Sequence, residues 1–367
     1  MIPRLHAKTL PGAVRPIQLS EPKIFADNES KHRSGHVGHA MTEFAPGKIM
    51  AFSANTSPVR LQGHSGFGWV EYSISEDYGE TFGAPRVLPF AWDTFLLGKN
   101  TVAVEKAVTL DNGEIVAFCL MNRQTAEVCC EPWDAPKAVI SADQGETWSQ
   151  PIDVTGYEGR IYDVLTHDGA VYVLEFCNNA ETFFCGTQPD HLYRLFKSTD
   201  NCRTFQEVCV VPFASTLDRG YGNMILNHKG ELIVYAYNCK DETHMDYILS
   251  PDFGETWTQS GTCFVQKQIR NPQVGILDGQ YILHGRAGGG APYEAFVLYT
   301  SADGILWDAG EYLVKYRPAS FYSENLTLKL PDGREKMLVK YSENYDEAPP
   351  EVWSGRVNSM MLTITSL

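Results

Sequence analysis

An eight-residue motif recurs along this chain and limits its fold more than any other feature. The clearest copy is Ser250-Pro-Asp-Phe-Gly-Glu-Thr-Trp257, and close copies begin at Ser75 and Ser141. A degraded copy begins at Ser198 and a shortened one at Ser301. The five serines are separated by 66, 57, 52 and 51 residues. A motif that returns about every 50 residues indicates a repeat architecture, in which each copy is one supersecondary unit.

The residue types within the motif are those of a hairpin turn. Its Asp side chain can accept backbone N–H groups of its own turn, and the Gly two residues later can adopt positive φ. The Thr and the aromatic residue then restart a strand. Each copy follows an apolar run, such as 69–74 or 295–300. We therefore expect each copy to join two antiparallel strands.

A second repeat lies upstream of the first and has six copies. Each copy is a short apolar strand, a turn with Gly, and a very apolar strand such as Leu232–Tyr237. Such continuous apolar strands belong in the middle of a sheet that is buried on both faces. Six units of four strands predict an all-β protein, a six-bladed β-propeller formed as a single domain over residues 1–367. The last blade would take its third strand from 355–365 and be closed by the N-terminal strand at 14–25.

The turn motif resembles the Asp-box, or BNR repeat, of the sialidase-like β-propellers. The resemblance implies the six-bladed fold, and it places the motif on the rim, away from the axis. The motif residues themselves therefore have a structural role. The resemblance implies the fold and says little about function, because the motif lies away from the axis.

Composition excludes several classes of partner. The chain has 367 residues with a formal net charge of −15, so it should repel nucleic acid and anionic membranes. No apolar run is long enough for a transmembrane helix, and no signal peptide is visible. The nine cysteines include no C-x-x-C pair, which fits free thiols in a reducing cytoplasm. We expect a cytoplasmic protein with no cofactor and no metal.

Propeller topology gives the candidate site residues, because first strands begin and second strands end on the same face. The candidates for acid, base or nucleophile are His36, His64, Glu105, Asp163, Tyr322 and Glu324. The candidates for substrate binding are His39, Arg160, Arg219, Tyr221, Arg270 and Arg286. Convergent guanidiniums suit a carboxylate or a sulfate. The alternative is a ring of ion pairs that only closes the channel.

Histidines open the first blade. His36 and His39 are three residues apart on a strand, so they should point to opposite faces. This spacing disfavours one metal bound by both, and the pair His36 and His64 is geometrically easier. Histidine near neutral pH can serve as a general acid or base.

The sialidase family's catalytic set is not retained. The family uses three arginines, a tyrosine nucleophile paired with a glutamate, and an aspartate as acid/base. Tyr322 resembles the nucleophile and Arg286 resembles the third arginine. The place of the first arginine is taken by His36, and no arginine or aspartate occupies the other expected positions. The place of the glutamate is taken by Arg219 or Tyr221. Ordinary sialidase activity is therefore not expected.

These observations predict a carbohydrate-active enzyme, a glycoside hydrolase that acts on a small acidic glycan in an axial pocket. One alternative is a polysaccharide lyase in which His and Tyr act on a uronate held by Arg. Another is a non-catalytic glycan-binding propeller. For the enzyme, we expect His36, Arg160, Arg219, Arg270 and Tyr322 to surround one cavity, since ligand sites are concave with a few well-placed polar groups.

Overall fold

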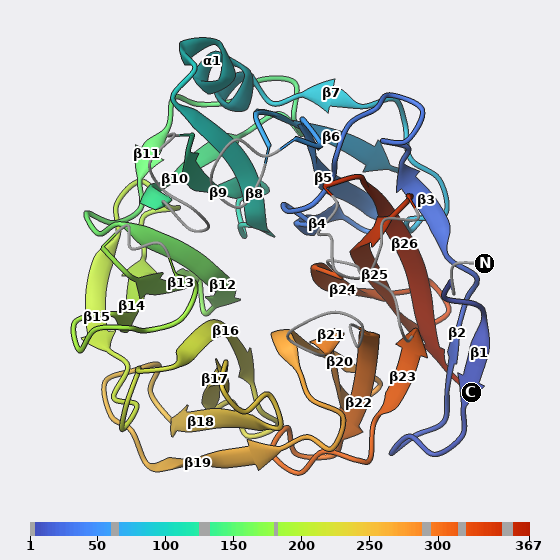
Figure 1. Ribbon diagram of the computed structural model, residues 1–367, viewed down its shortest axis with the longest axis vertical. Helices are drawn as coiled ribbons and strands as arrows, with labels where there is room; N and C mark the ends of the chain where they lie inside the picture. The colour runs from blue at the N-terminus through green and yellow to red at the C-terminus, as the bar shows by residue number, and fades with distance from the viewer. Residues whose placement is uncertain are drawn as a thin grey trace.

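Six antiparallel sheets stand around a common axis in the computed structural model, like the blades of a propeller (Figure 1). The structure describes residues 4–59, 66–124, 133–179, 183–287, 295–314, 321–346 and 355–367. The six-bladed, all-β prediction is confirmed.

The first five blades follow one another along the chain, and each has four strands in sequence order. Blade one holds β4 (Met41–Ala45), β5 (Lys48–Thr56), β6 (Gly68–Ser75) and β7 (Arg86–Val87). Blade two holds β8 (Asn100–Thr109), β9 (Ile115–Arg123), β10 (Trp133–Ser141) and β11 (Ile152–Asp153). Blade three holds β12 (Gly159–His167), β13 (Ala170–Cys177), β14 (Leu192–Ser198) and β15 (Gln206–Val210). Blade four holds β16 (Arg219–Leu226), β17 (Leu232–Asn238), β18 (His244–Ser250) and β19 (Gln259–Phe264). Blade five holds β20 (Arg270–Leu277), β21 (Gln280–Ala287), β22 (Ala295–Ser301) and β23 (Glu311–Val314).

Blade six joins the two ends of the chain. Its strands β24 (Ser323–Lys329), β25 (Glu335–Asn344) and β26 (Val357–Ser366) come from the C-terminal part. Two N-terminal strands, β2 (Ile17–Leu19) and β3 (Lys23–Ala26), both pair with β26, and β1 (Lys8–Leu10) pairs with β2. The predicted closure by the N-terminal segment is therefore confirmed, with two short strands in place of one.

The first strand of each blade lies innermost. Each of β4, β8, β12, β16, β20 and β24 contacts the next, and β24 contacts β4 to complete the ring (Figure 1). The second strands are buried on both faces, as their continuous apolar sequences predict. Their largest side chains, which include Phe52, Phe118, Phe176, Tyr235 and Tyr281, are fully buried between blades.

The repeated motif forms the turn after the third strand of each of the first five blades. In blade two, Ser141 Oγ accepts from Gly145 N at 2.7 Å, and Asp143 accepts from both the N–H and the hydroxyl of Thr147. These turns also bind neighbouring blades together. Tyr72 of blade one donates to the carbonyl of Gly145 at 2.6 Å, and Tyr235 of blade four donates to that of Gly304 at 2.8 Å.

The described residues include one α-helix, α1 (Pro89–Leu97), on the outer edge beside blade two (Figure 1). The sequence pattern did not reveal it, because nine residues are too few to show a helical period. Its proline is at the start, and Gly98 ends it with φ of 71°. This placement of proline and glycine is the local helix signal that the sequence does carry. No helix within the described ranges is both long and apolar enough to cross a membrane.

Candidate functional site

The candidate site is a small pocket on the axis, where the inner strands begin. Residues from all six blades line it, among them His39, Glu105, Arg160, Tyr221, Asn271 and Tyr322. Its volume is about 30 Å³. A cavity of this size holds about one water molecule or one small polar group. The pocket is therefore shaped to take a head group, with any larger ligand body lying above it.

β-Bulges turn several of these side chains toward the axis. Register shifts occur in four inner strands at corresponding positions, around Glu105 in β8, Tyr162 in β12, Tyr221 in β16 and Asn271 in β20. All four residues line the pocket. A bulge inserts one extra residue and re-aims a side chain, and bulges are common beside active sites. The repeated bulge thus brings polar groups to the axis without opening the ring of strands.

Tyr322 is the centre of the pocket's polar cluster. Its hydroxyl lies 2.9 Å from the hydroxyl of Tyr221, from blade four. The ring of His36, from blade one, meets its ring edge-on with 4.9 Å between centroids. The guanidiniums of Arg160 and Arg286 lie 5.7 and 5.5 Å from the centre of the same ring. One phenol is therefore approached by residues from blades one, three, four and five.

Two arginines near Tyr322, the buried Arg160 and the half-buried Arg270, retain hydrogen-bonding capacity. Arg160 is 3% exposed and pairs through Nη2 with Glu105 Oε2 at 2.5 Å. Among the described residues, Arg160 Nε and Nη1 and Arg270 Nε have no acceptor, and Glu105 Oε1 has no donor. The guanidinium of Arg270 lies 4.2 Å from the ring centre of Phe184. Buried polar groups are almost always hydrogen-bonded, so unmatched donors at a cavity indicate a missing acceptor.

A second layer of polar residues lies one or two residues further along the inner strands. Lys106 Nζ is 3.0 Å from Asp163, 2.5 Å from Glu324 and 2.8 Å from Gln273 Oε1. Asn223 Nδ2 donates to Asp163 at 2.6 Å. These five residues come from blades two to six, and we call them the cross-axis network. They close the axis beneath the pocket.

The charged groups of the network shift one another's pKa values. Burial works to lower the pKa of Lys106, but Asp163 and Glu324 outweigh it and the pKa is raised. Burial raises the pKa of Glu324, which Lys106 opposes and Asp163 reinforces. Both oxygens of Asp163 are already used, since it also accepts from the backbone N–H groups of Val164 and Met224. We therefore assign Asp163 a structural role.

His39 is held neutral next to a buried lysine. Burial first, and then Lys340, holds the pKa of His39 well below its usual value. Lys340 lies 3.4 Å from His39 Nδ1 and also donates to the carbonyls of Gly38 and Phe52. Lys340 was not among the candidates selected from the sequence. A lysine inside the apolar run 337–341 indicates an unusual buried charge only when the strand is known to be buried.

Six of the predicted residues line the pocket: His39, Glu105, Arg160, Tyr221, Tyr322 and Glu324. His36 and Arg286 contact the ring of Tyr322, and Asp163 pairs with Lys106. Arg219 pairs with Asp246 at 2.6 Å on the flank of blade four, because the bulge turns Tyr221 inward instead. His64 lies outside the described residues. Of the five residues expected around one cavity, Arg160 and Tyr322 line the pocket and His36 packs against Tyr322, whereas Arg219 and Arg270 are not among the lining residues.

Comparison with solved structures shows what this architecture resembles. A protein of unknown function from Dyadobacter fermentans superimposes with a TM-score of 0.67 at 13% identity, over 96% of this chain and 99% of that one. The Hadza microbial sialidase Hz136 gives 0.66 at 14% identity, over 95% of this chain and 69% of that one. This chain has the six-bladed β-propeller fold of these sialidases. A sialidase from Trypanosoma rangeli gives 0.57 at 11% identity, and the sialidase-like propeller spans 97% of its own length but 59% of that chain. No protein-family model and no curated protein matches the sequence.

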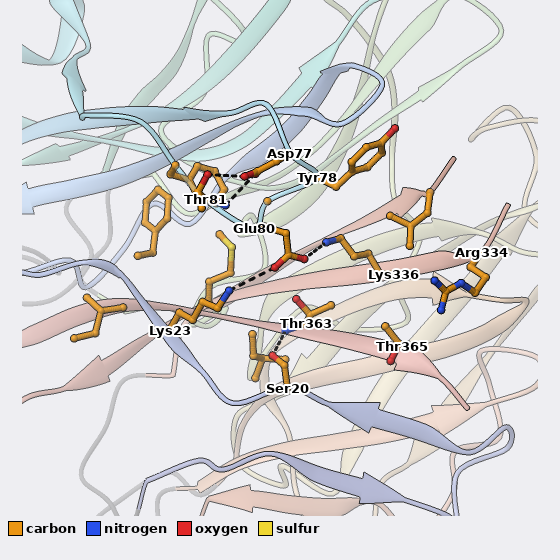
Figure 2. Close-up of a pocket in the computed structure, with 17 residues that line it drawn as sticks. Ser20, Lys23, Asp77, Tyr78, Glu80, Thr81, Arg334, Lys336, Thr363 and Thr365 are labelled. Atoms are coloured by element: carbon orange, nitrogen blue, oxygen red, sulfur yellow. Dashed lines mark hydrogen bonds and ion pairs between the residues drawn. The ribbon is translucent and has the colours of Figure 1, made fainter. Parts of the chain in front are cut away.

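A larger cavity than the axial pocket lies away from the axis. It has a volume of about 680 Å³ and lies between blade six and the repeated turn of blade one (Figure 2). The axial pocket is thus the smaller of the two, and it is distinguished by its convergent charges.

Proposed function

We propose that this protein is a glycoside hydrolase that binds a small acidic sugar by its carboxylate at the axial pocket. The observation that carries the proposal is that Arg160, which lines the pocket, has two buried guanidinium N–H groups, at Nε and Nη1, without an acceptor among the described residues. A carboxylate supplies the missing acceptors and the opposite charge. Charge-assisted bonds from arginine forks to carboxylates are among the stronger hydrogen bonds in proteins.

The arrangement of arginines around Tyr322 supports an anionic ligand. Arg160, Arg270 and Arg286 lie around Tyr322, so guanidiniums from blades three and five approach one phenol. Convergent guanidiniums suit a carboxylate, which they can bind through paired hydrogen bonds. The pocket takes only the anionic group, and the sugar ring would lie above it.

Candidate chemical roles follow from the contacts. Tyr322 is the candidate nucleophile, since tyrosine serves this role in glycosidases that depart from the two-carboxylate scheme. Tyr221 is its hydrogen-bond partner, where the sialidase family has a glutamate, so proton removal must differ here. Glu105, with one oxygen unmatched, is the candidate base. Glu324, whose pKa is raised by burial, is a candidate proton donor.

A uronate lyase is the second candidate function. His36 lies edge-on to Tyr322, and His39 is neutral beside the same pocket, so an imidazole and a phenol are both available for proton transfer. Lysis leaves an unsaturated product that absorbs in the ultraviolet, whereas hydrolysis adds only a reducing end.

The test combines turnover with binding. Acidic oligosaccharides are incubated with the protein, and reducing ends and ultraviolet absorbance are followed together. We expect reducing ends without absorbance, lost in Tyr322→Phe. In calorimetry, Arg286→Lys should weaken binding of the acidic sugar by about 1.5–3 kcal/mol, or roughly 10- to 150-fold, because it keeps the charge and loses the fork.

Arg219→Lys is the matched control, since Arg219 pairs with Asp246 outside the pocket, and its affinity should equal that of the wild type. Equal binding of an acidic sugar and its neutral amide would overturn the anionic-ligand proposal. Absorbing product would favour the lyase. Tight binding with no turnover of any acidic glycan would leave a glycan-binding propeller.

A further inference from the structure

The closure of the ring leaves a second hollow, which we call the closure groove. Its volume of about 680 Å³ falls in the range of small-molecule sites. One wall is the blade-one turn from Asp77 to Phe82, and the other is β25 and β26 of blade six, with the N-terminal residues 20–25 at the edge (Figure 2). The groove draws on both ends of the chain and on blade one, and shares no residue with the axial pocket.

Strand register gives the blade-six wall an apolar and a cationic part. Met361, Thr363 and Thr365 alternate along β26 and so share one face. Lys336 of β25 lies directly opposite Thr365 and is 6% exposed in its side chain. Phe25 and Phe82 pack edge-on at 5.0 Å at the other end. The groove thus has an aromatic and aliphatic end and a positively charged end.

The charged end is occupied by a carboxylate of the protein itself. Glu80, from the blade-one turn, accepts from Lys336 at 2.7 Å through one oxygen and from Lys23 at 3.5 Å through the other (Figure 2). Its side chain is 59% exposed, and within the described residues its carboxylate accepts no hydrogen bond from a backbone N–H group. Lys336 is buried and needs a carboxylate partner, whereas Glu80 is its exposed partner, so an incoming carboxylate can replace Glu80 without leaving the ammonium unpaired.

The next groove around the ring shows that this charge is not a general feature of the fold. The groove between blades one and two has a similar volume, about 660 Å³, and lies at the corresponding place. Its charged lining is four carboxylates and Arg86, whereas the closure groove has Lys23, Arg334 and Lys336 against Glu80 and Asp77. Both carboxylate oxygens of Asp77 accept hydrogen bonds from Ser75 and Thr81 of its own turn. In a chain of net charge −15, a cationic groove is a local exception.

We propose that the closure groove is a binding site for a small amphipathic organic anion, an aryl or acyl carboxylate. Its carboxylate takes the place of Glu80 on Lys336 and Lys23, with Arg334 at the margin. Its apolar body lies along Met361 and the rings of Phe25 and Phe82. The ion pair at one end of the groove and the apolar contact at the other together select a ligand that is both anionic and apolar.

The test uses 2-naphthoate and its neutral counterpart 2-naphthamide as probes, with binding measured by calorimetry on the full chain. We expect 2-naphthoate to bind at least tenfold more tightly than the amide. Lys336→Met, which keeps the apolar stem, should remove that preference. Glu80→Gln should tighten naphthoate binding severalfold, because it removes the competing carboxylate. A structural role alone for Glu80 predicts no gain.

Two matched variants locate the site. Arg86→Met changes the neighbouring groove and Tyr322→Phe changes the axial pocket, and neither should alter naphthoate binding. Equal affinities for acid and amide would overturn the proposal, as would an unchanged affinity in Glu80→Gln or the absence of binding to both wild type and Glu80→Gln. Weakening by Tyr322→Phe would place the probe at the axis instead.

Discussion

Single buried charges near the axis differ in how they are balanced. Lys106 is held between the carboxylates of Asp163 and Glu324, whereas Lys340 donates to two backbone carbonyls and contacts neutral His39. Carbonyl dipoles compensate a buried ammonium less than a carboxylate does. Burial accordingly lowers the pKa of Lys340 to about 7. These two lysines have opposite consequences for stability.

Lys340 should make the fold more stable at alkaline pH. Its pKa is about 7 when folded, against an ordinary value near 10.5 when unfolded. Between these values the unfolded chain binds more protons than the folded one, so the free energy of unfolding rises with pH. The destabilisation is full below about pH 7 and fades toward pH 10.5, on the order of 3–5 kcal/mol in total.

Chemical denaturation of wild type and Lys340→Met at several pH values from 6 to 10 measures this effect. The control is Lys48→Met, because Lys48 forms an exposed ion pair with Glu76. The unfolding free energy of wild type, relative to that of Lys340→Met, should increase as pH rises. A pH-independent difference would show that Lys340 stays charged in the fold.

Individual residues could be assigned to the axis from the sequence, but not to their partners. Glu105 and Lys106 are adjacent, and a strict alternation would send them to opposite faces. The bulge in β8 lets both reach the axis. The sequence gives no sign of that bulge, nor that Arg219 would turn to Asp246 while Tyr221 turns to Tyr322. Such pairings depend on neighbouring blades, which a local pattern does not encode.

At the scale of elements, the repeated turn acts as a contact between blades as well as a connection within one. The turn glycines have positive φ, and several face the preceding blade closely. A Cβ on Gly254, at φ of 99°, would lie 2.8 Å from Leu195 and 3.1 Å from the sulfur of Cys209 in blade three. The sequence predicted the turn, because its residue types suffice for that. It could not predict the packing across blades.

Gly254→Ala should therefore cost more than a turn glycine in open space. Strain at positive φ costs about 1 kcal/mol for alanine, and forcing a methyl into a packed interface adds about 1–3 kcal/mol. Gly333→Ala is the matched control, since Gly333 has φ of 85° with nothing within 4 Å of its Cβ position. Equilibrium unfolding should give a loss of about 2–4 kcal/mol for the first and about 1 kcal/mol for the second. Equal losses would mean that the turn does not brace the blades.

At the scale of the whole molecule, blade count and closure could be read from the sequence because they repeat. Six copies of the strand pair, five turns and an extra N-terminal strand leave few other arrangements. What fills the axis does not repeat, since each blade contributes a different residue to the pocket and the cross-axis network. The closure groove is likewise invisible in the sequence, because it exists only where residues 20–25 meet 361–365 and the blade-one turn.

The two ends of the chain should lose structure together. Leu19 is fully buried in the cluster that joins β2 to β25 and β26. Leu19→Ala should lower the unfolding free energy by about 2–4 kcal/mol through loss of burial and the cavity it leaves. Hydrogen exchange should then accelerate in 17–19 and in 357–366 at once, because these segments are paired. Exposed Leu306, changed to Ala, is the control and should have little effect. Faster exchange at only one end would argue against a shared closure.

The cross-axis network also limits the routes by which a ligand can enter and leave the axial pocket. Lys106, Asp163, Asn223, Gln273 and Glu324 bar the centre of the ring directly beneath the pocket. A molecule that reaches Tyr322 must therefore leave by the doorway through which it came. For the hydrolase proposed above, departing product and arriving substrate would share one passage and exclude each other. A sugar released there would act as a competitive inhibitor of substrate binding, and product release from the closed-ended pocket would limit the rate of turnover.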